Sequence, residues 1–359
     1  MNLPETLARI QPLDAAAMAA ARARQDMLTK PHGSLGRLEE LSVKVAGMTG
    51  QPLPRTDRKA VVTMAADHGI AMEEQVSAYP SEVTPQMVYN FLNSGAAINV
   101  LARQLGARVT VVDMGVAVEL DAPATLLNKK VAFGTQNMAK GPAMSRDQAI
   151  RAIEAGIAVV EGLVGEGLDL VATGDMGIGN TTASSAIVAA ITGAPVAAVT
   201  GRGTGIDDNL LANKVALIQR ALEINRPDPA DALDVLAKVG GFEIAGLVGV
   251  ILGSAAHRVP VVVDGFISGA AALVAGEMCP QARDYLIAAH SSVEIGHRVI
   301  LERMELAPLL NLDLRLGEGT GAALAMHLVE AAVRILKEMA TFAEAGVSES
   351  KEQDACSAS

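Results

Sequence analysis

One stretch decides the fold of this chain: Leu168-Asp-Leu-Val-Ala-Thr-Gly-Asp-Met-Gly-Ile-Gly-Asn-Thr-Thr182. Its first six residues are mostly apolar and lack the regular polar alternation of a half-exposed strand, which indicates a strand buried on both faces. The glycines that follow lead into an Ala-rich segment that favours a helix. A buried strand that turns directly into a helix is the repeating unit of a parallel sheet.

The same unit recurs along the chain. Further apolar runs, each followed by a polar or glycine-rich turn, occupy residues 60–66, 108–113, 259–263 and 285–289. We expect the sixth strand at 312–316, ahead of Gly317-Glu-Gly-Thr-Gly321 and a small-residue helix. About six such units predict an α/β fold with a Rossmann-like, doubly wound and mostly parallel sheet, whose functional sites lie at the carboxyl ends of the strands.

The termini differ from this central pattern. Residues 1–58 have helical patterns, and residues 328–345 form an amphipathic helix, so we expect the two ends to build a small helical domain. The catalytic α/β domain then spans residues 59–327. Residues 346–359 are small and polar, which is typical of a disordered tail.

Composition limits the classes of partner. The net charge of -11 argues against nucleic acid and anionic membranes, because both need a basic surface. Apolar runs such as 247–252 are too short to span a bilayer, and the N-terminus has no signal-peptide pattern. The two cysteines form no framework, so we expect a cytoplasmic protein. Zinc-type spacings of His and Cys are absent, and we expect neither metal nor cofactor.

Two glycine-rich loops are candidates for binding an anion. In the loop 174–182, Gly177 allows close approach, and Asn180 and Thr181 supply donors at the start of a helix; the alternative is a capped turn. Its spacing is not the dinucleotide fingerprint, and the chain has no Walker motif. The second loop, 200–208, precedes Lys214. Its acidic pair at 207–208 favours a helix cap over a magnesium site.

Aromatic residues give a further clue, because the sequence has only three Tyr and five Phe. Tyr79, Tyr89 and Phe91 lie close together in the chain. Such a cluster lines a site for a flat ring or packs locally, and the sequence leaves both interpretations open. Gln86 and Met87 in the same segment would add a polar contact and an adaptable wall.

Several acids follow the predicted strands, including Asp175 and Asp264. Glu318 differs from the others because glycines flank it on both sides, so that a substrate can approach its carboxylate closely. We therefore expect Glu318 to act as a base. Burial would raise its pKa and a helix dipole would lower it, and the sequence leaves that balance open.

Seven motifs in order resemble one family, the nicotinate-nucleotide–dimethylbenzimidazole phosphoribosyltransferases of cobalamin lower-ligand synthesis. The resemblance runs from about residue 25 to 335. The motifs are Lys30-Pro-His-Gly-Ser-Leu-Gly-Arg-Leu-Glu39, Ala66-Asp-His-Gly69, Gly141-Pro-Ala-Met-Ser145, Gly177-Ile-Gly-Asn-Thr-Thr182, Lys238-Val-Gly-Gly-Phe242, Asp264-Gly-Phe266 and Arg315-Leu-Gly-Glu-Gly-Thr-Gly-Ala-Ala-Leu-Ala-Met326.

The resemblance implies a homodimer that moves the 5-phosphoribosyl group of nicotinate mononucleotide onto 5,6-dimethylbenzimidazole. The products would be α-ribazole 5′-phosphate and nicotinate. The family's catalytic base falls on Glu318. Its phosphate and ribose contacts fall around Gly177, Lys214, Asp264 and Ser292, and we also expect Leu316 to contact substrate.

Two positions depart from the family pattern. Better-known members carry Glu where this chain has Asp175, so a proton-relay or cation-stabilising role there reaches one methylene less far. Some members have Ser at the position of Tyr79, which leaves the acceptor open between dimethylbenzimidazole, another benzimidazole and adenine. The alternative functions are a Rossmann-type oxidoreductase and a non-catalytic nucleotide or base sensor.

Overall fold

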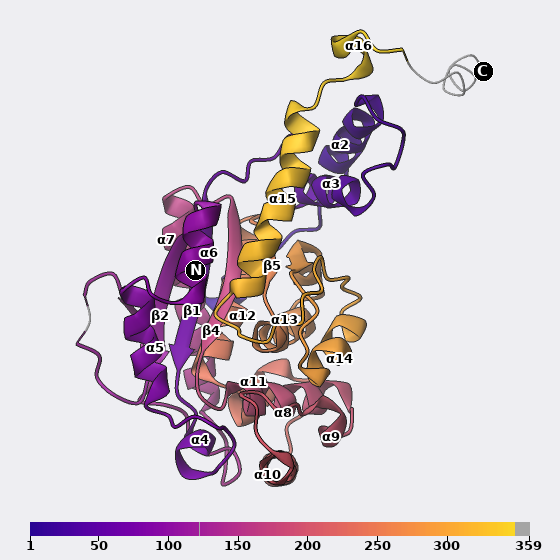
Figure 1. Ribbon diagram of the computed structural model, residues 1–359. Helices are drawn as coiled ribbons and strands as arrows, with labels where there is room; N and C mark the ends of the chain where they lie inside the picture. Colours follow the sequence, from indigo (N-terminus) through magenta and orange to yellow (C-terminus); the bar gives the residue numbers. More distant parts are fainter. Residues whose placement is uncertain (122, 349–359) are drawn as a thin grey trace. The chain divides into compact units, whose positions relative to one another are not determined.

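The computed structural model describes residues 1–121 and 123–348 (Figure 1). A six-stranded sheet has the order β3-β2-β1-β4-β5-β6, with all neighbours parallel. The predicted α/β, Rossmann-like architecture is confirmed. The strands are β1 (Lys59–Ala66), β2 (Arg108–Gly115), β3 (Leu127–Asn128), β4 (Leu170–Met176), β5 (Val261–Val263) and β6 (Leu286–Ala288).

The centre of the sheet is formed by β1, which pairs with β2 on one side and β4 on the other. Every residue of β1 is buried, as its continuous apolar sequence predicts. The chain order reverses between β1 and β4. In open α/β sheets, the crevice at such a reversal is where ligands bind.

Helices cover both faces of the sheet. α12 packs on β1, β2 and β4 with α7 against it, whereas the turn that leads into α15 packs beside Val61 on the other face of β1; α5 and α6 lie apart from α12 (Figure 1). The helices are α1 (Leu3–Arg9), α2 (Ala15–Met27), α3 (Arg37–Thr49), α4 (Gly69–Glu73), α5 (Val83–Leu92), α6 (Ala97–Leu105), α7 (Arg146–Gly165), α8 (Asn180–Thr192), α9 (Val196–Val199), α10 (Asp208–Asn225), α11 (Ala232–Val239), α12 (Phe242–Ala256), α13 (Phe266–Met278), η1 (Pro280–Tyr285), α14 (Ile295–Arg303), α15 (Thr320–Glu338) and α16 (Phe342–Ala345).

The prediction of a strand at 312–316 is wrong. Residues 312–316 form no strand, and the bridge nearest to them joins Leu310, before this stretch, to His290 beyond the end of β6. Asp313 then takes a left-handed backbone (φ 54°), which ends the extended conformation. The sixth strand is instead β3, a two-residue edge strand that pairs with β2 and is too short to show a periodic pattern.

The chain divides into two compact units. The first contains residues 1–12 and 58–326, with α1 packed on α7 and α12, so residues 1–12 do not belong to the helical unit where we expected them. The second contains residues 13–57 and the described residues from 327 onward. In it α2 packs on α3, and Leu28 bridges Thr341. Most of the expected tail, from residue 349, lies outside the described residues.

Within the described ranges, no helix is long and apolar enough to cross a membrane.

Glycines allow α7 and α12 to pack backbone to backbone. A Cβ added at Gly156 of α7 would lie 2.0 Å from the carbonyl oxygen of Gly246. One added at Gly249 of α12 would lie 1.9 Å from the carbonyl oxygen of Ile153. Because α12 packs directly on β1 and β4, this contact supports the centre of the sheet.

We predict that Gly156→Ala lowers the free energy of unfolding by about 1–3 kcal/mol or more, because the two helices must move apart. Urea denaturation measures the change. Gly162→Ala is the matched control on the same helix, where an added Cβ meets nothing within 4 Å, and it should stabilise by up to about 1 kcal/mol. Equal effects of the two substitutions would contradict the packing argument.

Candidate active site

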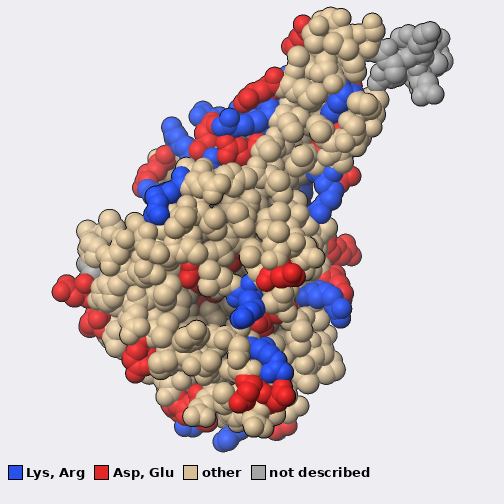
Figure 2. Space-filling view, viewed as in Figure 1, with Lys and Arg blue, Asp and Glu red and all other residues tan. Residues whose placement is uncertain are grey.

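A cavity of about 540 Å³ opens at the carboxyl ends of β4, β5 and β6. Its wall contains the turn between β4 and α8, the segments 76–87 and 203–204, and the loops after β5 and β6. Lys and Arg side chains alternate with Asp and Glu over the face shown in Figure 2 rather than forming a continuous basic surface. The predicted site residues in the wall are Tyr79, Met87, Asp175, Gly177, Asn180, Thr181, Ser292, Leu316 and Glu318.

Glu318 is held in an unusual backbone conformation within this wall. Its φ is 62°, and its flanking glycines are also left-handed, so the turn 317–319 folds tightly over the sheet. The Thr63 hydroxyl donates to the Glu318 carbonyl oxygen at 3.3 Å. A Cβ at Gly174 would lie 2.4 Å from that same oxygen, so only glycine in β4 leaves room for the turn.

The Glu318 carboxyl is suited to accept a proton. It is buried, and its Oε2 has no hydrogen-bond partner among the described residues. Burial raises its pKa, against a smaller lowering by the backbone N–H of Ile98 at the start of α6. The sequence left open whether burial or a helix N-terminus has the larger effect on the pKa of Glu318, and burial has the larger effect.

Asp175 lies one residue before the end of β4 and faces the same turn. Asn180 Nδ2 donates to Asp175 Oδ2 at 3.0 Å, which fixes the orientation of the carboxyl. Burial raises its pKa well above the ordinary value, and the nearby acids Asp264, Glu243 and Glu318 raise it further. A Cβ at Gly317 would lie 3.1 Å from Asp175 Oδ2, so a glycine there lets the two segments approach.

Asp264, expected to contact substrate, does not line the cavity. Its carboxylate accepts from the backbone N–H of Gly319 at 3.2 Å and of Ala322 at 2.8 Å. Burial nevertheless raises its pKa to about 7, although these hydrogen bonds lower it. The N-terminus of α15 is therefore occupied by the protein's own carboxylate, and an external anion has no access to these donors.

Lys214, another expected substrate contact, lies behind the wall on α10. Its Nζ donates to Thr181 Oγ1 at 2.8 Å and to the carbonyl oxygen of Gly201 at 3.5 Å. Burial lowers its pKa from 10.5 to about 8, against a smaller raising by Glu294. The lysine therefore acts on the cavity through Thr181, which does line it.

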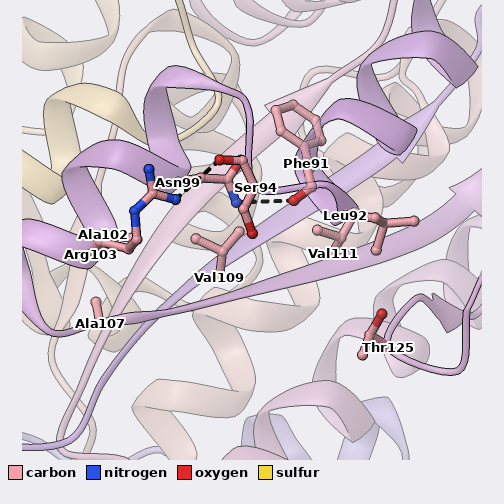
Figure 3. Close-up of a pocket in the computed structure, with 10 residues that line it drawn as sticks. All are labelled: Phe91, Leu92, Ser94, Asn99, Ala102, Arg103, Ala107, Val109, Val111 and Thr125. Atoms are coloured by element: carbon pink, nitrogen blue, oxygen red, sulfur yellow. Dashed lines mark hydrogen bonds between the residues drawn. The ribbon is translucent and has the colours of Figure 1, made fainter.

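The predicted aromatic cluster is divided between two places. Tyr79 lines the large cavity together with Val83 and Met87, which are four residues apart on α5 and share a face. Gln86 is exposed on another side of α5 and is not part of the wall. Phe91 instead borders a separate pocket of about 230 Å³ between α5, α6 and β2 (Figure 3). Of the two interpretations that the sequence left open, a single site lined by all three aromatic residues is not formed, because neither Tyr89 nor Phe91 lines this cavity.

Other wall residues escaped the sequence analysis. His290, Glu294 and Arg315 lie in the loops that close the cavity. Arg315 begins the last of the seven motifs but was assigned no role there, and Glu294 stands in a loop whose sequence shows no spacing that marks it. A signal existed for His290, which follows a predicted strand directly.

A buried ion pair supports the glycine turn from below. His68 Nε2 and Glu243 Oε1 are 2.6 Å apart, and both side chains are almost fully buried. A Cβ at Gly177 would lie 2.4 Å from the Ala66 carbonyl oxygen and 3.5 Å from Glu243 Oε1. Gly177 is thus needed for the turn to pack on the end of β1 and on this pair.

Within the described part of the chain, no three His, Cys, Asp or Glu side chains are grouped so that they could hold a metal ion. That the reaction needs no metal stays a prediction.

The fold and the cavity define the class of enzyme. A family model described as phosphoribosyltransferase matches residues 10–347, so the protein is a phosphoribosyltransferase. The nicotinate-nucleotide–dimethylbenzimidazole phosphoribosyltransferase of Roseiflexus sp. (strain RS-1) is 65% identical over 346 residues, 96% of this chain and 98% of the relative. That of Chloroflexus aggregans (strain MD-66 / DSM 9485) is 63% identical over 98% of this chain and 99% of its own.

Solved structures agree with these relatives. The crystal structure of CobT from Thermus thermophilus has a TM-score of 0.89 and 50% identity, covering 93% of this chain and 100% of its own. The chain belongs to the family of nicotinate-nucleotide–dimethylbenzimidazole phosphoribosyltransferases. The oxidoreductase and sensor alternatives find no support in these relatives.

The shifted pKa of Lys214 makes stability depend on pH. Between about 8 and 10.5 the unfolded chain binds the proton that the folded chain has released, so stability rises with pH in this window. Relative to Lys214→Met, we expect the free energy of unfolding of the wild type to rise by up to about 3 kcal/mol across it. Urea denaturation at several pH values measures this. Lys129→Met, at an exposed lysine, is the control, and parallel wild-type and Lys214→Met curves would contradict the expectation.

Proposed function

We propose that the protein transfers the 5-phosphoribosyl group of nicotinate mononucleotide to 5,6-dimethylbenzimidazole or a related base. The products are α-ribazole 5′-phosphate and nicotinate, and the reaction serves assembly of the cobalamin nucleotide loop. The observation that carries this proposal is Glu318, a buried carboxylate with an unpartnered oxygen in the wall of a cavity large enough for two small substrates. The names of the relatives support the same reaction.

One base is sufficient for this chemistry. The glycosidic nitrogen of the donor belongs to a pyridinium ring, so the leaving nicotinate takes the bonding electron pair and needs no proton. The acceptor is neutral and loses its N–H proton as its other nitrogen attacks the anomeric carbon, which inverts. Glu318 takes that proton, a role that typically contributes roughly 10²–10⁴-fold.

The phosphate of the donor fits the start of α8. Gly177 admits it closely, and the Thr181 hydroxyl, which also lines the cavity, supplies a donor. Lys214 hydrogen-bonds to Thr181, so it adds positive charge behind this subsite. Ser292, on the loop after β6, lines the same cavity and offers a further hydroxyl.

Asp175 acts next to the base. Burial and the neighbouring acids raise its pKa, so Asp175 takes up a proton more readily than an ordinary aspartate, which suits a proton relay. Asn180 orients it, and Gly317 keeps it close to the turn of Glu318. The shorter Asp side chain is thus accommodated by the local packing.

The acceptor ring packs on Tyr79, Met87 and Leu316. Tyr79 and Leu316 are exposed at the mouth, and Met87 adapts its shape readily. We leave the base open between dimethylbenzimidazole, other benzimidazoles and adenine. Turnover with each of these bases ranks them directly.

A cytoplasmic location stays a prediction.

We also propose a homodimer. Exposed apolar side chains gather on the segments that follow β6, at Val293, Ile295 and Leu312. The backbone N–H of Val293 donates to the carbonyl oxygen of Leu314 at 3.3 Å, so these segments run side by side. Covering such a patch removes apolar surface from water.

Sedimentation equilibrium tests the dimer. We expect the wild type to sediment as a dimer and Leu312→Glu to shift it toward a monomer, because a charge in a buried apolar interface is costly. Asn311→Glu, next to it in sequence, is the control for the added charge. A monomeric wild type at micromolar concentration would contradict the proposal.

The reaction itself is tested with purified protein, nicotinate mononucleotide and dimethylbenzimidazole. Chromatography should reveal α-ribazole 5′-phosphate and one nicotinate for each product. If neither compound forms, the proposed function is wrong.

Glu318→Gln should reduce kcat by about 10²–10⁴-fold, because the amide cannot accept the acceptor's proton. Binding of both substrates, measured by calorimetry, should stay within a few-fold, since the side chain keeps its size. Glu302→Gln, at an exposed acid on α14, is the matched control and should keep full activity. Near-normal turnover of Glu318→Gln would show that another group is the base.

A further inference from the structure

Arg315 occupies a special place in the cavity. Among the described residues that line it, Arg315 is the only lysine or arginine. Arg315 is an exposed residue. Its Nη1 donates to the carbonyl oxygen of Gly203 at 3.2 Å, across the mouth of the cavity. A guanidinium has five N–H donors, so this contact orients the group and leaves donors for a ligand.

The other ionisable groups of the wall are mostly acidic. Asp175, Glu294 and Glu318 line the cavity, and Glu294 is buried with one oxygen unpartnered. A ligand carboxylate placed against these side chains would find no positive charge. The wall therefore offers a second anionic group of the donor one cationic side chain, Arg315.

The donor in the proposed reaction does carry two anionic groups. Its phosphate is accounted for by the start of α8 and Thr181, which is backed by Lys214. The carboxylate on the pyridine ring remains. It is also the only feature that distinguishes nicotinate mononucleotide from its amide counterpart, nicotinamide mononucleotide.

We propose that Arg315 binds the ring carboxylate of the donor and thereby selects nicotinate mononucleotide over nicotinamide mononucleotide. This inference rests on the proposed function and names a specificity-determining residue of that site. Guanidinium and carboxylate match as a planar, charge-assisted pair.

The pairing also assists departure of the leaving group. In the bound donor the ring is a pyridinium carboxylate with no net charge. When the glycosidic bond breaks, its electron pair moves onto the ring nitrogen, and nicotinate leaves with one negative charge. Arg315 therefore binds the departing ring more strongly than the ground state, which is the condition for lowering the barrier. The nicotinamide ring changes from one positive charge to none, so its departure relieves repulsion from Arg315 but forms no ion pair with it.

The test compares the two donors, which have nearly the same shape. We expect Arg315→Gln to lower kcat/KM for nicotinate mononucleotide on the order of 10–100-fold, as for the loss of a charge-assisted hydrogen bond. For nicotinamide mononucleotide, kcat/KM should change less than about 3-fold, because that ring makes no ion pair. Arg315→Lys should restore part of the preference, since it keeps the charge and loses the planar geometry.

Arg202→Gln is the matched control. Arg202 lies in the same loop as Gly203, and its Nη1 donates to the carbonyl oxygen of Ile206 at 2.9 Å, but it does not line the cavity. We expect this variant to keep the wild-type preference between the donors. A role of Arg315 in holding the loop, or in binding phosphate, would lower kcat/KM for both donors equally in Arg315→Gln and would overturn the inference.

Inhibition by the free rings gives a second readout that does not depend on the choice of donor. Nicotinate should inhibit Arg315→Gln at least about 10-fold more weakly than the wild type, and nicotinamide about equally well. Equal inhibition constants for nicotinate in the two proteins would also overturn the inference. If the wild type makes no product from either donor, the proposed function fails, whereas an active wild type with an unchanged variant removes only the role of Arg315.

Discussion

The close packing of the turn 317–319 on the centre of the sheet is the constraint on which the site depends. A Cβ at Gly319 would lie 2.6 Å from Val61 Cγ1, and one at Gly174 would lie 2.4 Å from the Glu318 carbonyl oxygen. The strands β1 and β4 therefore determine where the turn lies. Asp264 holds it from the other side by accepting two N–H groups at the start of α15. Glu318 is thus presented from a rigid support, which a base must have to meet a proton in one geometry.

This arrangement places several acids at one edge of a sheet where little water reaches them. Asp175, Asp264 and Glu318 all have raised pKa values, chiefly because of burial. Burying such groups lowers the free energy of unfolding at neutral pH. Their presence where the strand order reverses is typical of a functional site. Lys214, whose pKa burial lowers, lies behind the cavity wall and donates a hydrogen bond to Thr181, which lines the cavity. The acids suited to proton transfer and the Thr181 hydroxyl backed by Lys214 thus border one cavity.

Much of the fold was accessible from the sequence because buried parallel strands leave a continuous apolar pattern. The runs at 60–66, 108–113 and 168–173 all became strands. The run at 312–316 failed for a local reason, since Asp313 leaves the extended conformation and both Leu312 and Leu316 are exposed. The edge strand β3 has two residues, too few to show any periodicity.

For the site, the sequence by itself determined which loops carry it, because glycines and acids follow the strands and parallel strands end at one edge. Only the tertiary structure decided which side chains reach the cavity. The side chains of Asp264 and Lys214 hydrogen-bond to other residues of the chain. Gln86 is exposed to solvent, and Arg315 lines the cavity. The reason is physical: a side chain's direction and the burial that shifts its pKa arise from contacts between segments far apart in the chain, and no local pattern of residues contains them.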